Sequence, residues 1–438
     1  MFIFPDYHNS VQMNGTEETI MNRRFGKYVS VMMLTAALIG CTAVNGETYA
    51  ADGSGSTVTT VSVASVTESS DEYFTERDLK QTADLTDAVS YTVEDGQNIT
   101  ISEEGVYVLH GSAKEVTVTV DAADEAKVQI VLDGVTITNT DAPCIYVKNA
   151  DKVFVTLTDS MNALEVTGTF TADGDTNTDA VIFSEDDLVL NGTGTLTIQS
   201  TDNAVTSKDD LKVTGGTYVI TCTSKAFETN DLIAVADGTF TINAGTDGLH
   251  SENDDDSTLG SIYIENGTFA IDAGDDGVHA AATIAINGGT FDINAAEGIE
   301  GTVIEINDGT VSITAADDGI NAGKKSTIST PSITINGGDI SISMGAGDTD
   351  AIDANGNITI NGGTVTITAN SPFDFDGTGA LNGGTVTVNG SVITSLSSQM
   401  MGGGMMGGMP GGWMSGFSSQ ADEADAQSYG SAEYGMRQ

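Results

Sequence analysis

The sequence predicts an all-β fold of the parallel β-helix type, in which short strands wind into stacked coils. One recurring phrase begins at a glycine-threonine pair and reads GTFTINA from 238, GTFAIDA from 267, GTFDINA from 289 and GTVSITA from 309. A second phrase follows it and reads DGLH from 247, DGVH from 276, EGIE from 297 and DGIN from 318. Both phrases return every 20 to 29 residues, a spacing typical of stacked repeats.

The first phrase predicts a strand with one buried face, because its apolar residues occupy alternate positions. The residues two places after each glycine form one apolar column: Leu196, Tyr218, Phe240, Phe269, Phe291, Val311, Ile340, Val365 and Val386. An alternative fold for this pattern is a sandwich of antiparallel hairpins. Hairpins would not return aromatic residues to one register at coil-sized intervals, so we favour stacked parallel coils.

Each coil is expected to hold two further strands. A short apolar alternation precedes each glycine, as at Ile262 and Ile264, and the DGIx phrase supplies a third short strand. Several alternations end in an Asn-Gly turn, where we expect both residue types to tolerate the positive φ of a sharp corner. These turn asparagines are Asn287, Asn336, Asn361 and Asn382.

The first 40 residues are interpreted as an extension followed by a secretory signal. Met21 is the better start, because basic residues follow it and a short apolar run from Tyr28 to Ile39 comes next. The ending Leu-Ile-Gly-Cys resembles a bacterial lipoprotein box, which would attach a lipid to Cys41. Cleavage after Ala50 is the alternative. The sequence therefore predicts a secreted or cell-surface protein, a bacterial lipoprotein that contacts a membrane only through this anchor.

The remaining boundaries follow from composition. Residues 41–70 are a Ser/Thr-rich linker, and residues 71–396 are the β-helix domain with an N-terminal cap. We expect a short helix within this cap, between Asp71 and Ala88. Residues 397–438 form a low-complexity tail rich in Met and Gly. A copper site of clustered thioethers is the less favoured interpretation of this tail.

The second phrase predicts a metal site. Its apolar residue points inward, so its acidic neighbours face outward and stack from coil to coil along one edge. Like charges at this spacing repel, and a chain with a formal net charge of -48 has few cationic side chains to relieve the repulsion. Ca²⁺ binds six to eight oxygens and would relieve it. The predicted calcium ligands are Asp247, Asp275, Asp276, Glu297, Glu300, Asp317, Asp318, Asp350 and Asp353.

Two simpler interpretations of this edge remain open. It can be a solvated acidic surface, and Asp also favours tight corners for conformational reasons. His250 and His279 occupy equivalent positions in successive coils. We interpret them as stacked surface imidazoles in preference to a zinc pair.

Several motifs together resemble a known family. They are GGTVTITA, DDGINA, the IxINGG turns, the lipoprotein-like start and the tail phrase MGGMPGG. Between Tyr91 and Leu396 the chain resembles the clostridial calcium-binding, polysaccharide-binding β-helix family, also described as carbohydrate-binding domain-containing proteins. The resemblance implies a right-handed parallel β-helix similar to pectate lyases. It also implies calcium binding, and binding of plant cell-wall polysaccharide such as cellulose or acidic pectin without catalysis.

The residues favour binding over catalysis. A pectate lyase abstracts a proton with a base that is usually arginine, and the chain has no arginine between Arg77 and Arg437. We expect no cluster of lysines beside the acidic column. A hydrolase using Asp247, Asp275 and Asp276 near His250 is an alternative, as is a surface adhesin or structural rod. Because most aromatic residues are expected to be interior, acidic glycans are favoured over neutral ones, and nucleic acid is not an expected partner.

Overall fold

The computed structural model describes residues 73–345 and 349–398, which form strands β1 to β34 joined by turns. This described part contains no helix that could span a membrane. The predicted secretory signal, the lipidation site Cys41 and the Met/Gly-rich tail lie outside the described residues.

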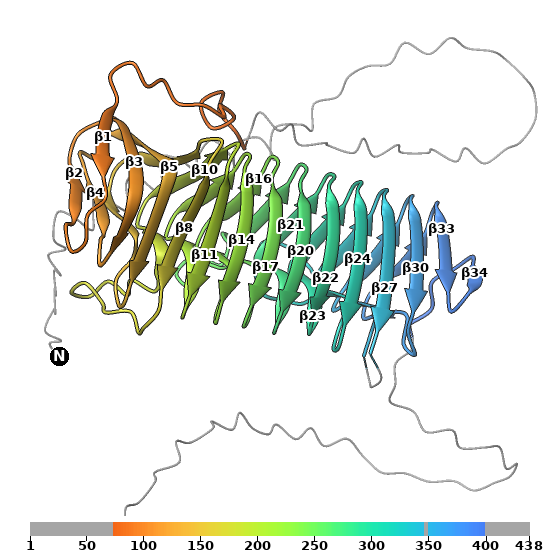
Figure 1. Ribbon diagram of the computed structural model, residues 1–438. Helices are drawn as coiled ribbons and strands as arrows, with labels where there is room; N and C mark the ends of the chain where they lie inside the picture. Colours follow the sequence, from red (N-terminus) through yellow and green to blue (C-terminus); the bar gives the residue numbers. More distant parts are fainter. Residues whose placement is uncertain (1–72, 346–348, 399–438) are drawn as a thin grey trace, which may run out of the picture. The chain divides into compact units, whose positions relative to one another are not determined.

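The strands form three columns, and each strand pairs in parallel with its counterpart in the next coil (Figure 1). Long strands contribute to two columns. The first column contains β1 (Val89–Thr92), β3 (Gly105–Lys114), β5 (Lys127–Asn139), β7 (Lys152–Leu157), β10 (Asp187–Gly192), β13 (Asp210–Val213), β16 (Leu232–Val235), β19 (Ser261–Ile264), the ends of β21 (Asp276–Ile286) and β23 (Glu297–Ile306), β26 (Ser332–Ile335), β29 (Asn357–Ile360) and β32 (Gly379–Leu381).

The second column carries the strands of the GTF phrase. It contains the ends of β3 and β5, then β8 (Met161–Val166), β11 (Thr195–Ser200), β14 (Thr217–Cys222), β17 (Thr239–Ala244), β20 (Thr268–Ala273), β22 (Thr290–Ala295), β24 (Thr310–Ala315), β27 (Asp339–Met344), β30 (Thr364–Thr368) and β33 (Thr385–Val388). The last strand, β34 (Ser391–Ile393), pairs with β33 in antiparallel fashion.

The third column carries the strands of the DGIx phrase. It contains β2 (Ile99–Ile101), β4 (Val118–Asp121), β6 (Ile145–Asn149), β9 (Ala180–Ser184), β12 (Asn203–Ser207), β15 (Phe227–Thr229), β18 (Leu249–Ser251), the starts of β21 and β23, β25 (Ile320–Ala322), β28 (Ile352–Ala354) and β31 (Asp374–Phe375). Three strands per coil in parallel register confirm the predicted β-helix.

The interior is filled by ladders of similar side chains. The ring centroids of Phe240 and Phe269 lie 4.5 Å apart, as do those of Phe269 and Phe291, and Tyr218 continues the stack below Phe240. All four aromatic residues are buried, as the alternation predicts. Rings at this separation pack face to face because neighbouring coils lie about 4.8 Å apart.

The turns differ from the expectation in one respect. Positive φ belongs to the second glycine of each turn, such as Gly289 and Gly338, and not to the preceding asparagine. The asparagines instead form a hydrogen-bonded ladder, in which each Nδ2 donates to the Oδ1 of the asparagine one coil earlier at 2.7 to 2.9 Å. The ladder comprises Asn287, Asn307, Asn336, Asn361 and Asn382. Stacked amides therefore stabilise this corner.

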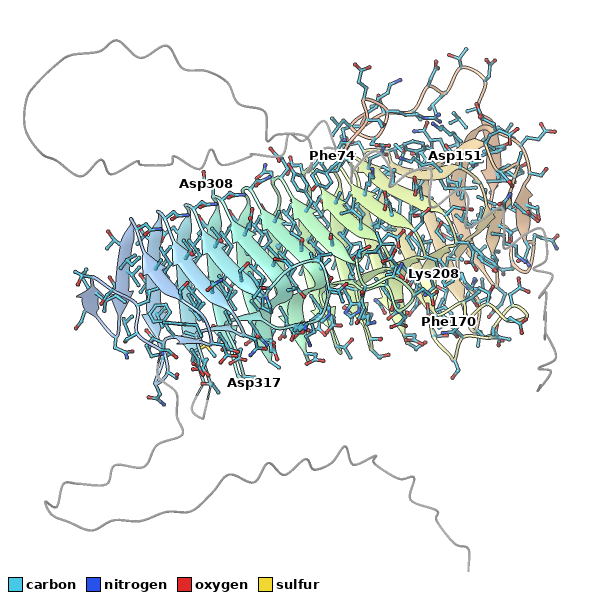
Figure 2. All side chains as sticks on the ribbon, turned by 180° about the vertical axis from the view of Figure 1, so that it is seen from behind. Phe74, Asp151, Phe170, Lys208, Asp308 and Asp317 are labelled. Carbon is cyan, nitrogen blue, oxygen red and sulfur yellow. The ribbon has the colours of Figure 1, made fainter. Side chains whose placement is uncertain are left out.

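The expected helix between Asp71 and Ala88 is wrong, because the described part of this segment contains turns. Tyr73 stacks on Tyr263 with ring centroids 3.8 Å apart, and Gln81 donates through Nε2 to the Thr214 carbonyl at 2.9 Å. Phe74 joins the same flank and is labelled in Figure 2. These tertiary contacts with β13, β16 and β19 replace local helical hydrogen bonds, so the segment covers the flank of the coils instead of forming a helical cap.

Candidate functional site

The DGIx phrase produces two adjacent columns of polar side chains, which we call the ridge. Its first column contains Lys225, Asp247, Asp276, Glu297, Asp318, Asp350 and Ser371. Its second column contains Glu228, His250, His279, Glu300, Asn321, Asp353 and Asp374. Between the two columns the inward positions hold buried residues such as Leu249, Val278 and Ile299.

Seven of the nine predicted ligands therefore lie in the ridge. The other two, Asp275 and Asp317, occupy exposed corners just before it. Figure 2 shows Asp317 projecting from the edge of the coils. The vertical alignment arises because each phrase starts at the same point of its coil, so the register of the buried residues fixes the register of the acidic ones.

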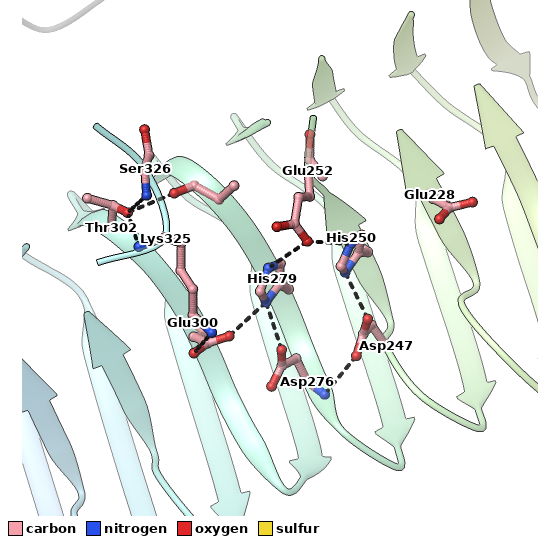
Figure 3. A network of polar contacts seen from close by, with 12 residues as sticks. Glu228, Asp247, His250, Glu252, Asp276, His279, Glu300, Thr302, Lys325 and Ser326 are labelled. Carbon is pink, nitrogen blue, oxygen red and sulfur yellow. Dashed lines mark hydrogen bonds and ion pairs between the residues drawn. The ribbon is translucent and has the colours of Figure 1, made fainter. Parts of the chain in front are cut away.

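One half of the ridge contains both acids and bases. Together with the adjacent Glu252 and Lys325, we call it the histidine section: Asp247, His250, Glu252, Asp276, His279, Glu300 and Lys325 (Figure 3). The Nδ1 atom of His250 lies 2.8 Å from Asp247 Oδ2. The Nδ1 atom of His279 lies 2.8 Å from both Asp276 Oδ2 and Glu300 Oε2. Lys325 Nζ lies 2.7 Å from Glu300 Oε1. Each buried carboxylate thus contacts a group that can carry positive charge.

These contacts control protonation. Burial alone would lower the pKa of His279, but Asp276 and Glu300 raise it to about 10. Burial would raise the pKa of Glu300, yet His279 and Lys325 hold it below its usual value. The pKa of Asp247 is likewise lowered against the effect of burial, because of His250. Asp276 is the exception, because burial raises its pKa despite the contact with His279, and Glu300 and Asp247 add to the shift. The other charges of the histidine section are compensated internally.

Two sequence-based interpretations of these residues need correction. The imidazoles of His250 and His279 do stack, with centroids 4.6 Å apart and ring planes 10° apart, but they are buried and not on the surface. Lysines do accompany the acidic columns, because Lys225 contacts Glu228 at 2.9 Å as Lys325 contacts Glu300. Lys325 comes from the loop after β25, and the sequence gives no periodic signal for its return.

The other half of the ridge, which we call the carboxylate section, contains Glu297, Asp318, Asp350, Asp353 and Asp374. Three of its contacts are with neutral groups: Asn321 donates to Glu297, the Asp350 backbone N–H donates to Asp318, and Ser371 donates to Asp350. Among the described residues, Glu297, Asp318 and Asp353 form no ion pair with Lys, Arg or His.

Their protonation reflects this environment. Burial and then neighbouring carboxylates raise the pKa of Asp353 to about 7 and that of Asp318 to about 6. The pKa of Glu297 rises to about 7 for the same reasons, although Asn321 opposes the shift. Carboxylates that repel one another in this way provide a favourable environment for a cation.

Comparison with known proteins now identifies the family. The family model for carbohydrate-binding domain-containing proteins matches residues 95–348 and 299–398. The chain belongs to this family. The resemblance carried by the sequence motifs is thereby confirmed.

The chain is similar to a curated protein and to a solved structure. A carbohydrate-binding domain-containing protein of Acetivibrio thermocellus is 32% identical over 145 residues, which cover 32% of the chain and 50% of the relative. The chain thus matches about half the length of that protein. A solved structure of the polysaccharide lyase-like protein from C. thermocellum, in a gadolinium derivative, is 21% identical with a TM-score of 0.32. That alignment covers 69% of the chain and 94% of the solved chain.

The carbohydrate-binding domain brings a few potential ligand atoms very close together. In its described residues, three trios of side-chain atoms each converge within 4.8 Å: His250, Glu252 and His279; Asp276, His279 and Glu300; and Asp187, Asp209 and Asp210. Asp318, Asp350 and Asp353 do not form such a trio. A cation in the carboxylate section would therefore also need backbone, amide, water or ligand oxygens.

Proposed function

We propose that the chain binds polysaccharide without catalysis and in a calcium-dependent manner, at the bacterial cell surface. The lipoprotein box at Cys41 would supply the anchor. A plant cell-wall polysaccharide is the expected ligand, and among the candidates we favour an acidic, pectin-like polyuronate over cellulose.

The observation that carries this proposal is the carboxylate section of the ridge. Asp318, Asp350 and Asp353 present hard oxygen donors on adjacent coils. The Asp350 backbone N–H donates to Asp318, Ser371 donates to Asp350, and neighbouring carboxylates repel one another. This donor set suits Ca²⁺, which accepts carboxylate, amide, carbonyl and water oxygens in a flexible shell. Asp318, Asp350 and Asp353 would hold the ion, and Glu297 and the Asn321 amide lie beside them.

A bound Ca²⁺ would supply positive charge and open coordination positions for a sugar carboxylate. The chain's own residues then orient the glycan. In the second strand column, outward Thr, Ser and Asn side chains alternate with buried residues, as in β20, β22 and β24. Their hydroxyl and amide groups can donate hydrogen bonds to sugar hydroxyls. Without a cation, the ridge would repel a polyuronate.

The distribution of aromatic residues supports an acidic ligand. Neutral glucans are commonly bound by exposed aromatic side chains that stack on the sugar rings. Within the described chain, every Phe and Tyr is buried or only partly exposed. The surface is therefore better suited to ionic and hydrogen-bonded recognition.

A second candidate function, a polysaccharide lyase or glycoside hydrolase, is favoured by the histidine section. Lys325 and His279 both contact Glu300, so groups able to donate and accept protons lie together. A surface adhesin or structural rod is the third possibility, and its binding target would be a protein.

The test is an affinity gel containing polygalacturonate, with either calcium or EDTA. We expect strong retardation only with calcium, and at least tenfold weaker binding for Asp318→Asn and Asp353→Asn. Glu305→Gln is the matched control, because Glu305 is exposed near the end of β23, in the first strand column and outside the ridge. Equal retardation in EDTA would exclude calcium bridging.

Catalysis and protein binding have separate readouts. Release of unsaturated uronides, followed by ultraviolet absorbance, would establish the lyase and replace the binding proposal. No binding on a glycan array, together with binding to a protein partner, would favour the adhesin.

A further inference from the structure

We propose that His250, Glu252 and His279 form a binding site for a divalent transition metal of the zinc class, separate from the calcium ligands. The site lies where β18 and β21 meet in the ridge. Glu252 Oε2 lies 3.6 Å from His250 Nε2 and 3.9 Å from His279 Nε2 (Figure 3). The three ligand atoms all lie within 4.8 Å of one another.

Both imidazoles are held in place by carboxylates, and rotation of the almost parallel rings would aim both Nε2 lone pairs at one ion. Their stacked rings direct the two Nε2 atoms toward Glu252, while each Nδ1 lies 2.8 Å from a carboxylate oxygen, that of Asp247 or of Asp276. Metal-binding histidines usually contact a carboxylate or carbonyl through the second ring nitrogen, which fixes the ring and increases its basicity. His279 makes this contact as a hydrogen bond to Asp276, and His250 makes it as an ion-pair contact with Asp247.

An unsatisfied polar atom points into the same place. His279 Nε2 is buried and has no hydrogen-bond partner, and the 3.9 Å to Glu252 is too long for a hydrogen bond. The whole residue is only 6% exposed. A buried polar nitrogen normally has a partner, so a bound cation that takes the place of the Nε2 proton would explain its position.

The distances and the donor types indicate the class of metal. Zinc bonds of about 2.0 to 2.2 Å place tetrahedral ligands about 3.4 Å apart. The two distances from Glu252 Oε2, 3.6 and 3.9 Å, need to shorten by a few tenths of an ångström, and the two histidine ligand atoms, which lie within 4.8 Å of each other, have to approach to the same separation. The Glu252 side chain is 43% exposed and has room to move. Two imidazoles and one carboxylate suit zinc-class ions, whereas Ca²⁺ and Mg²⁺ prefer oxygen ligands.

The site also has an open side. Three protein ligands leave at least one coordination position of a four-coordinate ion for water or another oxygen. Because Glu252 lies at the exposed end of the trio, this position would face solvent. The metal would join two successive coils through His250 and His279.

The experiment uses tag-free, full-length protein stripped with EDTA and then dialysed. Titration calorimetry with Zn²⁺ should give one site, and Co²⁺ should give visible absorption bands of a tetrahedral nitrogen and oxygen environment. Glu252→Gln should weaken binding at least tenfold, and Asp247→Asn should weaken it about 10- to 100-fold through the second ring nitrogen of His250. Millimolar Ca²⁺ should not displace the bound ion.

Two matched variants keep the result interpretable. His110→Gln removes another histidine, and Asp353→Asn changes the carboxylate section; both should bind Zn²⁺ like the natural chain. Glu252 is partly exposed, so its substitution should leave the fold intact, which circular dichroism would check. Absence of Zn²⁺ binding, or binding unchanged by both Glu252→Gln and His250→Gln, would overturn the proposal.

Discussion

The two halves of the ridge contain the same strand register but resolve charge repulsion in different ways. In the histidine section, His250, His279 and Lys325 contact the acidic side chains directly. In the carboxylate section, the equivalent positions to His279 are Asn321 and Asp353, so acids meet amides and other acids. The backbone repeat therefore aligns acidic side chains in both sections. The identity of the neighbouring residues decides whether basic side chains or a bound cation balance their negative charge.

The largest expected effect is in the histidine section. His279→Leu would leave Asp276 and Glu300 buried beside an apolar group, and loss of one partner of a buried ion pair costs about 3–5 kcal/mol. Denaturant unfolding in EDTA at neutral pH should show this loss. The control His110→Leu loses only the contacts of the half-buried His110 ring with Ser90 and Thr92, so it should cost about 1 kcal/mol. If the two variants were equally stable, the histidine section would not be internally compensated.

Calcium should have the next largest effect, and only through the carboxylate section. A ligand that binds the native state alone at 100 times its Kd adds about 2.7 kcal/mol to the free energy of unfolding. We expect this gain to disappear in Asp318→Asn and Asp353→Asn, and to persist in Asp247→Asn. Thermal unfolding with and without calcium measures it. Loss of the gain in Asp247→Asn alone would transfer the calcium site to the histidine section.

The pH dependence should distinguish the two sections in the absence of metal. The native pKa of Asp353 is about 7 against an ordinary value of 3.8, so the folded state binds more protons than the unfolded state between these values. Ionisation of Asp353 therefore lowers the free energy of unfolding. The whole loss is present above the native pKa, and none of it is present below the ordinary pKa.

Asp353→Asn provides the measurement. In EDTA it should be more stable than the natural chain at pH 8, and the difference should shrink as the pH falls through 7 toward 4. Unfolding midpoints across this range would test it, with Asp292→Asn as the pH-independent control. A difference that grows on acidification would show that the carboxylates do not repel one another.

The smallest effect is expected at the exposed end of the histidine section. The Lys325 side chain is 39% exposed, so solvent screens its contact with Glu300, and Lys325→Met should cost about 1 kcal/mol or less. Its neighbour Lys324 is exposed and gives the matched control, Lys324→Met, with no measurable change expected. Denaturant midpoints at low and high salt would compare them. If Lys325→Met lowered the free energy of unfolding more than His279→Leu, Lys325 would be the main positively charged partner of the acidic side chains.

Much of the candidate site could be anticipated because it follows the repeat. The buried residues Leu249, Val278 and Ile299 recur at equivalent positions, and this recurrence in the sequence is enough to align Asp247, Asp276 and Glu297. Glu252 was missed, although it lies only two residues after His250. Glu252 occurs in one coil and is not repeated in the others, so no pattern in the sequence marks it.

The coils, their inward apolar ladders and the ridge of stacked acids follow from the amino-acid pattern alone, because strand alternation and repeat length act on every coil alike. Which acids meet a base, how the imidazoles are buried and where the segment around Phe74 packs depend on the folded chain. Those contacts depend on loops and side-chain conformations that do not repeat. A period in the sequence fixes what recurs along the stack, whereas a single contact between distant residues is fixed by packing in three dimensions.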